Sequence, residues 1–539
     1  CTGSYISCSK QLTQDARSRS LNVPHRPSAM SSAPPADPAP TSTGATARGR
    51  WADPLTWLLI WAILGTVGRV LLSGAVTWDQ AEQLIWIQTI QWGYGAQPPL
   101  YTWIQWLVSA ALGPSVLSLA VVKHALMALT FVFLYLAARE IMPRRAAWLA
   151  SLGTFWLPGM GWQVLRDQTH TVLLTCMVAA TWWLLLRQIR SPSRCGFALL
   201  GAVMAAGVLS KYSYVLFAGA AALAALSLPE ARRALLGRGW WWAPALALLL
   251  IAPHAAWIWS HWDDATRSTL TKLRPPHEGA LRALLGGLED WLKVVIGAAL
   301  PWALMAWWAL GAPAWRGVSV AAPARPTPDW PGRLLVRYLL IVVAALLAMV
   351  LFAGVSRLEG RWVHPLVLIA PMAAFAWWPA LGEQPRGQRR YLIAVGVMAG
   401  LLWLVNWSDS WLDAARGHAD RFNWPVGQIE AQLRAAGYDG KAPIIANRHI
   451  GGGLLRSRFP EAHVTVCDIE RWDAELCVQD TTHHARQQGR RWWLVAVEDA
   501  PSAGWWDAAE PADGPAATPH SVALPFRFSH DGKPTLSLQ

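Results

Sequence analysis

Residues 77–103 read TWDQAEQLIWIQTIQWGYGAQPPLYTW and follow directly on the first long apolar run of the chain, at about 54–75. This polar island begins with two carboxylates, Asp79 and Glu82, and continues into an aromatic-rich amphipathic segment and a Pro-Pro break. An apolar run of about 20 residues is long enough to cross a bilayer as a helix. The position of the island therefore places both carboxylates at a membrane surface.

The composition indicates a membrane protein. The 539 residues are 54% hydrophobic and only 15% charged, and their mean hydropathy is +0.25, which is too apolar for a soluble protein of this size. The 37 Trp fit belts at the membrane interfaces, although sugar stacking could account for a few of them. The net charge of +13 resides in short loops between apolar runs, so membrane topology explains it better than nucleic-acid binding does.

Apolar runs follow one another along the chain, and each is long enough to span or nearly span a bilayer. The runs lie at 54–75, 115–138, 146–163, 169–187, 197–210, 213–228, 240–259, 290–311, 334–353, 362–380 and 391–408. We therefore predict an all-α polytopic membrane domain with about 11 transmembrane helices over residues 51–409. Residues 1–50 are rich in Ser, Pro, Ala and Thr, and we expect a disordered tail there.

Positive charges predict the orientation of this domain. Arginine clusters mark alternate loops, at 139–145, 187–194, 232–238, 316–333 and 386–390. Residues 76–114, in contrast, contain no Lys or Arg. Because positively charged loops stay in the cytoplasm, the N-terminus is predicted to be cytoplasmic and the Asp79 loop and C-terminal region periplasmic or extracellular.

Residues 410–539 have the pattern of a separate small α/β domain. A helix is predicted near 424–436. Apolar β-rich segments separated by helical ones lie at 443–447, 463–468 and 492–497. On the oxidising periplasmic side, Cys467 and Cys477 would be either a disulfide or two free buried thiols, and the sequence leaves both open.

The spacing of Asp79 and Glu82 allows two roles. Residues three apart share one face of a helix, so the two carboxylates could act together. The same D-x-x-E spacing is a capping pattern, with Asp79 as N-cap and Glu82 at the third helical position. Beyond them, residues 85–92 and the segment from Pro98 are predicted to be helices in the plane of the membrane interface, although their aromatic residues could serve only as lipid anchors.

Further polar clusters lie on the outer side under this topology. They are Arg166, Asp167 and His170; Lys211 and Tyr212; and Arg357, Glu359, Arg361 and His364. Each cluster alone could be an ordinary charged loop. Ionisable groups at membrane depth cost roughly 2.5–3.5 kcal/mol, so they tend to face cavities and one another. Convergent carboxylates and cations suit a site that deprotonates a hydroxyl and neutralises a phosphate.

Other motifs predict no site. The Gly451-Gly452-Gly453 run lacks the Lys-Ser/Thr pair of a phosphate-binding P-loop. His483 and His484 have no Cys or carboxylate at zinc-ligand spacing. We therefore predict no metal site and assign no cofactor, although a divalent cation could take part.

Several segments resemble the GT-C glycosyltransferases of the protein O-mannosyltransferase and lipid A aminoarabinose transferase superfamily (family 39-like). They are WDQAEQLIW with GYGAQPPLYTW, VLSKYSYVLF, PHAAWIWSHWDD and RLEGRWVHPLVL. The resemblance covers most of the membrane portion, roughly residues 55–410. The tail IIANRHIGGGLLRSRFP is also similar to the soluble tail of bacterial members. The resemblance implies two interfacial helices in the first external loop, a periplasmic cavity, an undecaprenyl-phosphate-type sugar donor, and Asp79 as catalytic base.

Two residues depart from the pattern of this superfamily. Gln80 follows Asp79 where many relatives have Glu, so that the next acid is Glu82. Gln97 precedes the Pro-Pro pair where many relatives have Lys, a candidate phosphate contact. Gln97 and nearby Tyr101 remain predicted substrate-binding residues. The phosphate would then need another cation, and the candidates are Lys211, Arg357 and Arg361.

These observations predict a glycosyltransferase of the bacterial inner membrane. It would move a sugar, with inversion, from a polyprenyl-phosphate donor to a hydroxyl of a glycan, lipid or protein on the periplasmic side. Asp79 would accept the proton of this hydroxyl. The alternatives are a lipid or glycan transporter or flippase, and a non-catalytic glycan- or lipid-binding scaffold. A transporter would show inverted repeats with broken helices in matching halves, and the sequence shows no such symmetry.

Overall fold

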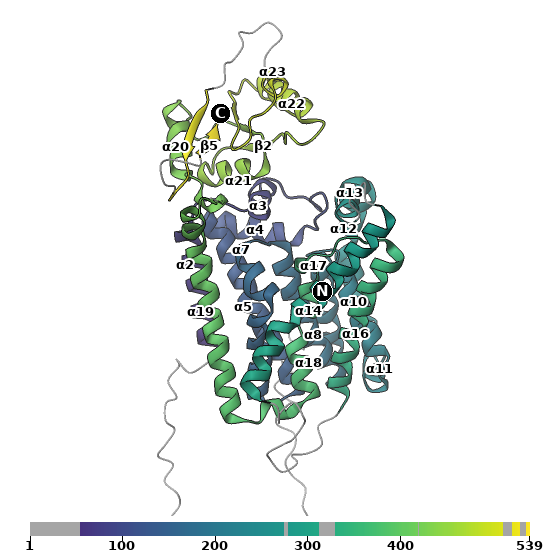
Figure 1. Cartoon of the computed structure of the whole chain (residues 1–539). Helices are drawn as coiled ribbons and strands as arrows, with labels where there is room; N and C mark the ends of the chain where they lie inside the picture. The colour runs from purple at the N-terminus through teal and green to yellow at the C-terminus, as the bar shows by residue number, and fades with distance from the viewer. Residues whose placement is uncertain (1–53, 274–278, 312–328, 419, 510–519, 529–534) are drawn as a thin grey trace, which may run out of the picture. The chain divides into compact units, whose positions relative to one another are not determined.

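Long apolar helices packed side by side make up most of the chain (Figure 1). This computed structural model describes residues 54–273, 279–311, 329–418, 420–509, 520–528 and 535–539. The tail predicted for residues 1–50 lies outside them. Among the described residues, seven helices are long and apolar enough to cross a membrane, or eight if the bent pair α10 and α11 counts as one span. The seven are α2 (Pro54–Leu72), α5 (Val116–Ile141), α8 (His170–Arg190), α12 (Trp242–Ser260), α14 (Ala280–Leu310), α16 (Trp330–Ala353) and α19 (Pro385–Ala415).

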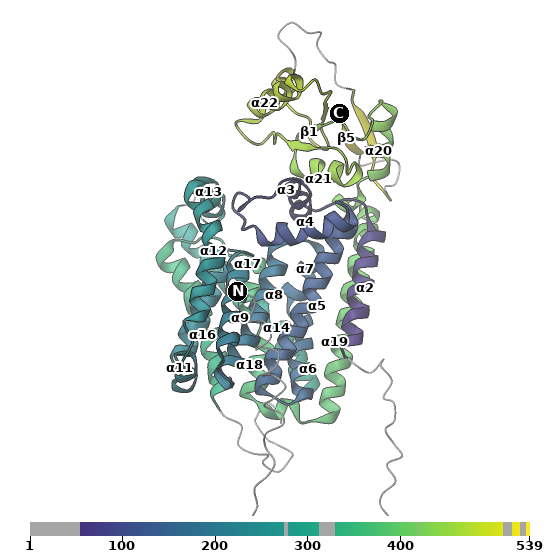
Figure 2. The same ribbon diagram turned by 180° about the vertical axis from the view of Figure 1, so that it is seen from behind.

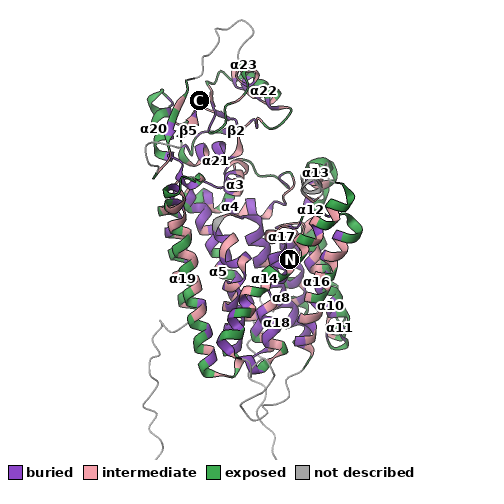
Figure 3. Ribbon diagram, in the orientation of Figure 1, coloured by how far each residue is buried: buried purple, intermediate pink, exposed green. Residues whose placement is uncertain are grey.

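The burial pattern agrees with a membrane domain. Buried residues fill the middle of the bundle, whereas exposed residues run along outer helices such as α19 (Figure 3). Many exposed side chains are large and apolar, for example Leu59 on α2 and Leu404 on α19. Lipid tails can cover such faces, because they are as apolar as the side chains themselves. The prediction of an all-α polytopic membrane domain is confirmed.

The four remaining apolar runs are short or broken helices. They form α6 (Arg144–Leu152), η2 (Gly153–Trp156), η3 (Gly159–Gln163) and α7 (Val164–Arg166); α9 (Arg194–Val208); α10 (Tyr214–Leu226) and α11 (Pro229–Leu235); and α17 (Gly360–Val367) and α18 (Ala370–Trp377). Pro158 and Pro371 lie at two of the breaks, and proline cannot donate the backbone hydrogen bond that a continuous helix needs. Of the 11 apolar runs, seven are therefore single long helices and four are these shorter pieces. A further helix, α13 (Trp262–Leu273), follows α12.

Two short helices, α3 (Trp78–Trp86) and α4 (Leu100–Leu112), connect α2 to α5 at the end of the bundle opposite α6 and α11 (Figures 1 and 2). The prediction of two helices in this connection is confirmed. The bounds predicted for the first one, 85–92, are wrong, because the chain leaves the helix at Trp86. Gln88 instead bonds the backbone of Val464 through both side-chain atoms, at 2.9 Å each. No local pattern in the sequence reveals this distant partner.

The C-terminal region has the predicted α/β fold. Three parallel strands lie in the order β2 (Val464–Val466), β1 (Ile444–Ala446) and β3 (Trp493–Val495), and Ile444 is in register with Val464 and Trp493. The helices of this region are α20 (Val426–Ala435), α21 (His449–Arg458), α22 (Ala474–Gln487) and α23 (Ala503–Asp507), and β4 (Val522–Pro525) pairs antiparallel with β5 (Thr535–Leu538).

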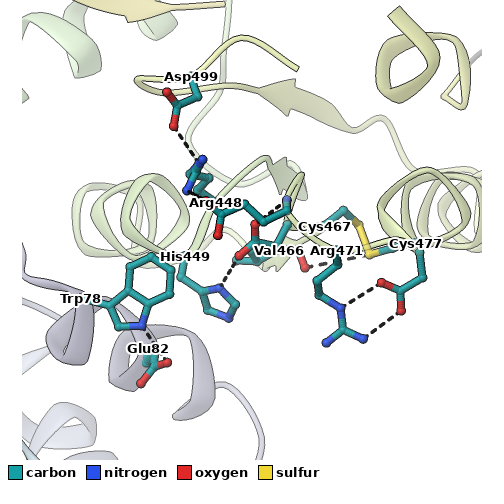
Figure 4. Close-up of polar contacts among 12 residues, drawn as sticks. Trp78, Glu82, Arg448, His449, Val466, Cys467, Arg471, Cys477 and Asp499 are labelled. Atoms are coloured by element: carbon teal, nitrogen blue, oxygen red, sulfur yellow. Dashed lines mark hydrogen bonds and ion pairs between the residues drawn. A yellow bond between two sulfur atoms is a disulfide. The ribbon is translucent and has the colours of Figure 1, made fainter. Parts of the chain in front are cut away.

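The cysteines of this region, Cys467 and Cys477, form a disulfide (Figure 4). The predicted strands and the helix near 424–436 agree with the observed bounds to within two residues. The domain boundary at 409/410 stays a prediction, and α19 continues past it to Ala415.

Candidate active site

The first turn of α3 presents Asp79 without using it as a cap. Thr77 is the N-cap, and the Gln80 side chain accepts a hydrogen bond of 3.2 Å from the Thr77 backbone N–H. The capping roles considered for Asp79 and Glu82 are therefore wrong, because Thr77 and Gln80 fill them. Asp79, the second residue of the helix, is partly exposed and forms no hydrogen bond to the described residues. Its carboxylate is available to a substrate.

Arg69, near the end of α2, holds the start of α3 in place through hydrogen bonds. Its guanidinium donates to the carbonyls of Ser73 and Ala75 at 2.7 and 2.6 Å, and to Gln80 Oε1 at 3.0 Å. The Phe422 ring lies 5.1 Å from the guanidinium carbon. Arg69 thus ties the segment between the two helices to the residue that completes the cap of α3.

Charged residues from four other elements surround Asp79. Burial and the Asp167 carboxylate raise the pKa of Asp79, whereas the cations of Lys211, Arg361 and Lys123 act on it in the opposite direction. The structure therefore brings together four of the residues singled out in the sequence. It adds Lys123, which the sequence analysis missed.

Asp167 and Lys123 are held by their own contacts. Thr77 donates from its hydroxyl to Asp167 Oδ1 at 2.7 Å, so this carboxylate is linked to the cap of α3. Lys123 Nζ donates to the Asp167 carbonyl at 3.1 Å. A lone lysine inside the apolar run 115–138 was the signal that could have revealed it, since a charge at that depth is costly unless it has a partner.

His170 and Tyr101 form one wall of the site. Gln83 of α3 bonds His170 Nε2 at 3.0 Å and accepts a hydrogen bond of 2.9 Å from Thr102 Oγ1. The rings of Tyr101 and His170 are 5.3 Å apart. Burial and the charge of Asp79 raise the pKa of Tyr101, so its hydroxyl stays protonated and can donate a hydrogen bond.

Lys211 and His364 meet the first turns of α8. Lys211 Nζ donates to Thr171 Oγ1 at 2.8 Å, and His364 Nε2 lies 3.2 Å from Thr175 Oγ1. The side chain of Tyr212 contacts α12 instead. Its hydroxyl lies 3.3 Å from His254 Nε2, and burial raises the pKa of Tyr212 to about 12.

The predicted cluster before α17 is an ion-pair network centred on Glu359. Its carboxylate lies 2.5 Å from Arg361 Nε and 3.4 Å from Arg357 Nη2. Of the two arginines, Arg361 acts on Asp79. The side chain of Arg357 is 60% exposed.

Two further predicted residues, Glu82 and Gln97, do not converge on Asp79 in the described structure. Glu82 accepts a hydrogen bond of 3.0 Å from Trp78 Nε1, on the side of α3 that faces α21 (Figure 4). Gln97 pairs with Tyr94 through two backbone hydrogen bonds of 3.0 Å in a tight turn. The side chain of Arg166 lies outside the described residues.

One acidic cluster lies apart from this site. Among the described side chains, oxygen atoms of Asp409, Asp413 and Asp420 lie within 4.8 Å of one another, at the end of α19. None of the three acts on Asp79.

Comparison with known proteins gives a consistent result. Residues 96–257 match the family described as dolichyl-phosphate-mannose-protein mannosyltransferase. Two Rhizobium johnstonii proteins, the lipopolysaccharide core galacturonosyltransferases RgtB and RgtA, are each 29% identical to the chain, over 76% of its length and 81% of theirs. The crystal structure of ArnT from Cupriavidus metallidurans bound to undecaprenyl phosphate is 14% identical, with a TM-score of 0.55, over 90% of this chain and 98% of that one.

The chain has the GT-C fold and is similar in sequence to glycosyltransferases. The resemblance noted in the sequence and the GT-C fold are both confirmed by these matches. At the end of the bundle where α3 and α4 lie, the partly exposed Asp79 carboxylate therefore lies among the cations of Lys211, Arg361 and Lys123.

The C-terminal α/β region packs directly on α3. A Cβ atom added to Gly453 of α21 would stand 2.4 Å from Ala81 Cα, so only glycine permits this approach of the two helices. The rings of Trp78 and His449 are 5.7 Å apart, and His449 lies 3.2 Å from Asp468 Oδ2 (Figure 4). The glycine run at 451–453 is thus a helix-packing surface.

Proposed function

We propose that this glycosyltransferase moves a sugar from a polyprenyl-phosphate donor to a glycan hydroxyl on the periplasmic side of the bacterial inner membrane. The observation that carries the proposal is the position of Asp79. It is the one partly exposed carboxylate at the start of α3 that is surrounded by Lys211, Arg361 and Lys123 in the described structure. A base beside several cations suits the transfer of a sugar from a phosphate to a hydroxyl.

The proposed step is a single displacement. The acceptor hydroxyl gives its proton to the Asp79 carboxylate, and its oxygen attacks the anomeric carbon of the donor sugar. The bond between this carbon and the phosphate oxygen breaks, and the electron pair leaves with the lipid phosphate. Attack from the face opposite the leaving group inverts the anomeric configuration.

The cations would stabilise the lipid phosphate as it leaves. Lys211 acts as a point charge, and Arg361 has guanidinium N–H groups beyond the Nε that pairs with Glu359. Lys123 supplies a third positive charge near the base. Their positions are fixed by Thr171, Glu359 and the Asp167 carbonyl, so little reorganisation is needed during the reaction.

The relatives support the choice of donor and acceptor class. ArnT was crystallised with undecaprenyl phosphate, which supports a polyprenyl-phosphate carrier for this enzyme. The two proteins from Rhizobium johnstonii are named for the lipopolysaccharide core, which favours a glycan over a protein hydroxyl as acceptor. A uronic acid is the sugar class that their names suggest.

The test separates transfer from transport. The purified full-length protein in proteoliposomes is given a polyprenyl-phosphate sugar with radiolabel in the sugar, together with a lipopolysaccharide core acceptor. We expect the label to appear in the glycan and unlabelled polyprenyl phosphate to be released. Movement of intact donor across the bilayer without cleavage would contradict the proposal and favour a flippase.

A further inference from the structure

A pocket lies where the end of α2 meets the C-terminal domain. Residues 425–428 at the start of α20, Gly74, Arg458 and Arg527 line a cavity of about 380 Å³. Gly427 opens onto it, since a Cβ atom added there would meet no atom within 4 Å. The pocket is large enough for a headgroup and shares no residue with the site around Asp79.

The lining of this pocket is positively charged. Arg458 Nε donates to Glu430 at 2.8 Å, but Glu430 also binds Arg434 at 3.2 Å, so two arginines share one carboxylate. Arg527 donates to the carbonyl of Leu72 at 3.1 Å. In the described part of the chain, no carboxylate oxygen lies within 4.0 Å of Arg527. The pocket therefore keeps an excess of positive charge.

The pocket lies at the level of a membrane surface. The carbonyl that Arg527 binds belongs to Leu72, the last residue of the candidate span α2. In the part of α2 that precedes Leu72, the side chains of Val67, Val70 and Leu71 are exposed, and the exposed fraction of Leu71 is 65%. Figures 1 and 2 both show α20 next to the upper ends of α2 and α19. An apolar stripe that ends at a cationic pocket matches a lipid with an anionic headgroup.

We infer that this pocket binds the phosphate or carboxylate headgroup of an anionic membrane lipid, with the lipid chains along the exposed stripe of α2. The guanidinium group of arginine can donate two parallel hydrogen bonds to one phosphate or carboxylate group. Gly74 precedes Asp79 by five residues, which span at most about 17 Å of extended chain. If the proposed function holds, an acidic glycolipid acceptor anchored here would have its sugars within reach of Asp79. The binding itself does not depend on that function.

The test uses the full-length protein in nanodiscs of phosphatidylcholine with a minor fraction of phosphatidylglycerol. Lipids that stay bound on release from the nanodisc are counted by native mass spectrometry. We expect the wild type to retain phosphatidylglycerol preferentially. The double variant Arg458→Gln/Arg527→Gln should lose about tenfold or more of this preference, because two charged hydrogen-bond donors are removed. Arg491→Gln, an exposed arginine of the same domain outside the pocket, should change nothing.

A second variant tests the pocket without altering charge. Gly427→Trp fills the open space beside Gly427 and should also abolish the preference, whereas Gly427→Ala should keep it. Equal retention of the two lipids by the wild type, or a preference that survives in both pocket variants, would overturn the inference. Displacement of the lipid by inorganic phosphate alone would identify a free-phosphate site and refute the lipid assignment. Sugar transfer is not the readout, so failure of the proposed function leaves this result interpretable.

Discussion

The contact between α21 and α3 leads to a prediction at Gly453. Replacing Gly453 with alanine would place a methyl group 2.4 Å from Ala81 Cα, 2.6 Å from its Cβ and 2.8 Å from its carbonyl oxygen. Two of these atoms are backbone, so no side-chain rotation relieves the overlap. Ordinary contact begins at 3.4 Å, and the helices must therefore separate by about 1 Å.

The expected magnitudes follow from this displacement. Overpacking of this kind lowers the free energy of unfolding by about 1–3 kcal/mol. The higher helix propensity of alanine than of glycine offsets about 1 kcal/mol of this loss. The net loss of stability is therefore about 0–2 kcal/mol, which a folded protein tolerates. Asp79 lies two residues from Ala81 on the displaced helix, and a misplacement of about 1 Å in a catalytic group can lower the rate about 10²-fold.

The assay measures the rate of sugar transfer by purified Gly453→Ala together with its thermal unfolding midpoint. Gly396→Ala is the matched control, since it adds the same methyl group to a helix, α19, in open space. We expect a large fall in kcat for Gly453→Ala alone, at a nearly unchanged midpoint. A kcat within about threefold of the control would refute the idea that the C-terminal domain positions the base.

Three further predictions concern charge and topology. Because the Asp167 carboxylate helps to raise the pKa of Asp79, Asp167→Asn should move the acid limb of the pH–rate profile to lower pH, and a shift to higher pH would contradict this. Lys211→Gln and Arg361→Gln should each weaken use of the donor more than use of the acceptor, as measured by the two KM values, whereas Arg357→Gln should have little effect, since Arg357 is not among the groups that act on Asp79. Reporter fusions after residue 390 should read as cytoplasmic and fusions near residue 420 as periplasmic, and the reverse pattern would place the site on the wrong side for the proposed donor.

The elements that the sequence predicted are those set by local pattern. Each strand of the three-stranded C-terminal sheet lies inside a β-rich segment predicted from the sequence, and its bounds agree with the prediction to within two residues. Asp79, Asp167, Lys211 and Arg361 converge because charges near a membrane are stable only when they face one another. The general location of the site could therefore be predicted before any contact was known.

The features that the sequence did not predict depend on distant contacts. The end of α3 at Trp86 follows from the bonds between Gln88 and Val464, which are 376 residues apart. The cap of α3 involves Gln80, which Arg69 of the preceding helix holds in place. Lys123 was hidden in an apolar run, and its role becomes visible only when Asp167 is seen beside it. Pattern alone cannot supply such partners.

The measurement that tests the central claim most directly is the transfer rate of Asp79→Asn with a polyprenyl-phosphate sugar. Asparagine keeps the shape of the side chain but cannot accept a proton, so the rate should fall about 10²-fold or more. Because burial raises the pKa of Asp79 above that of the unfolded chain, the ionised carboxylate does not stabilise the folded protein, so its replacement should not lower the unfolding midpoint. A folded variant that keeps its rate within about threefold of wild type would contradict the assignment of Asp79 as the base.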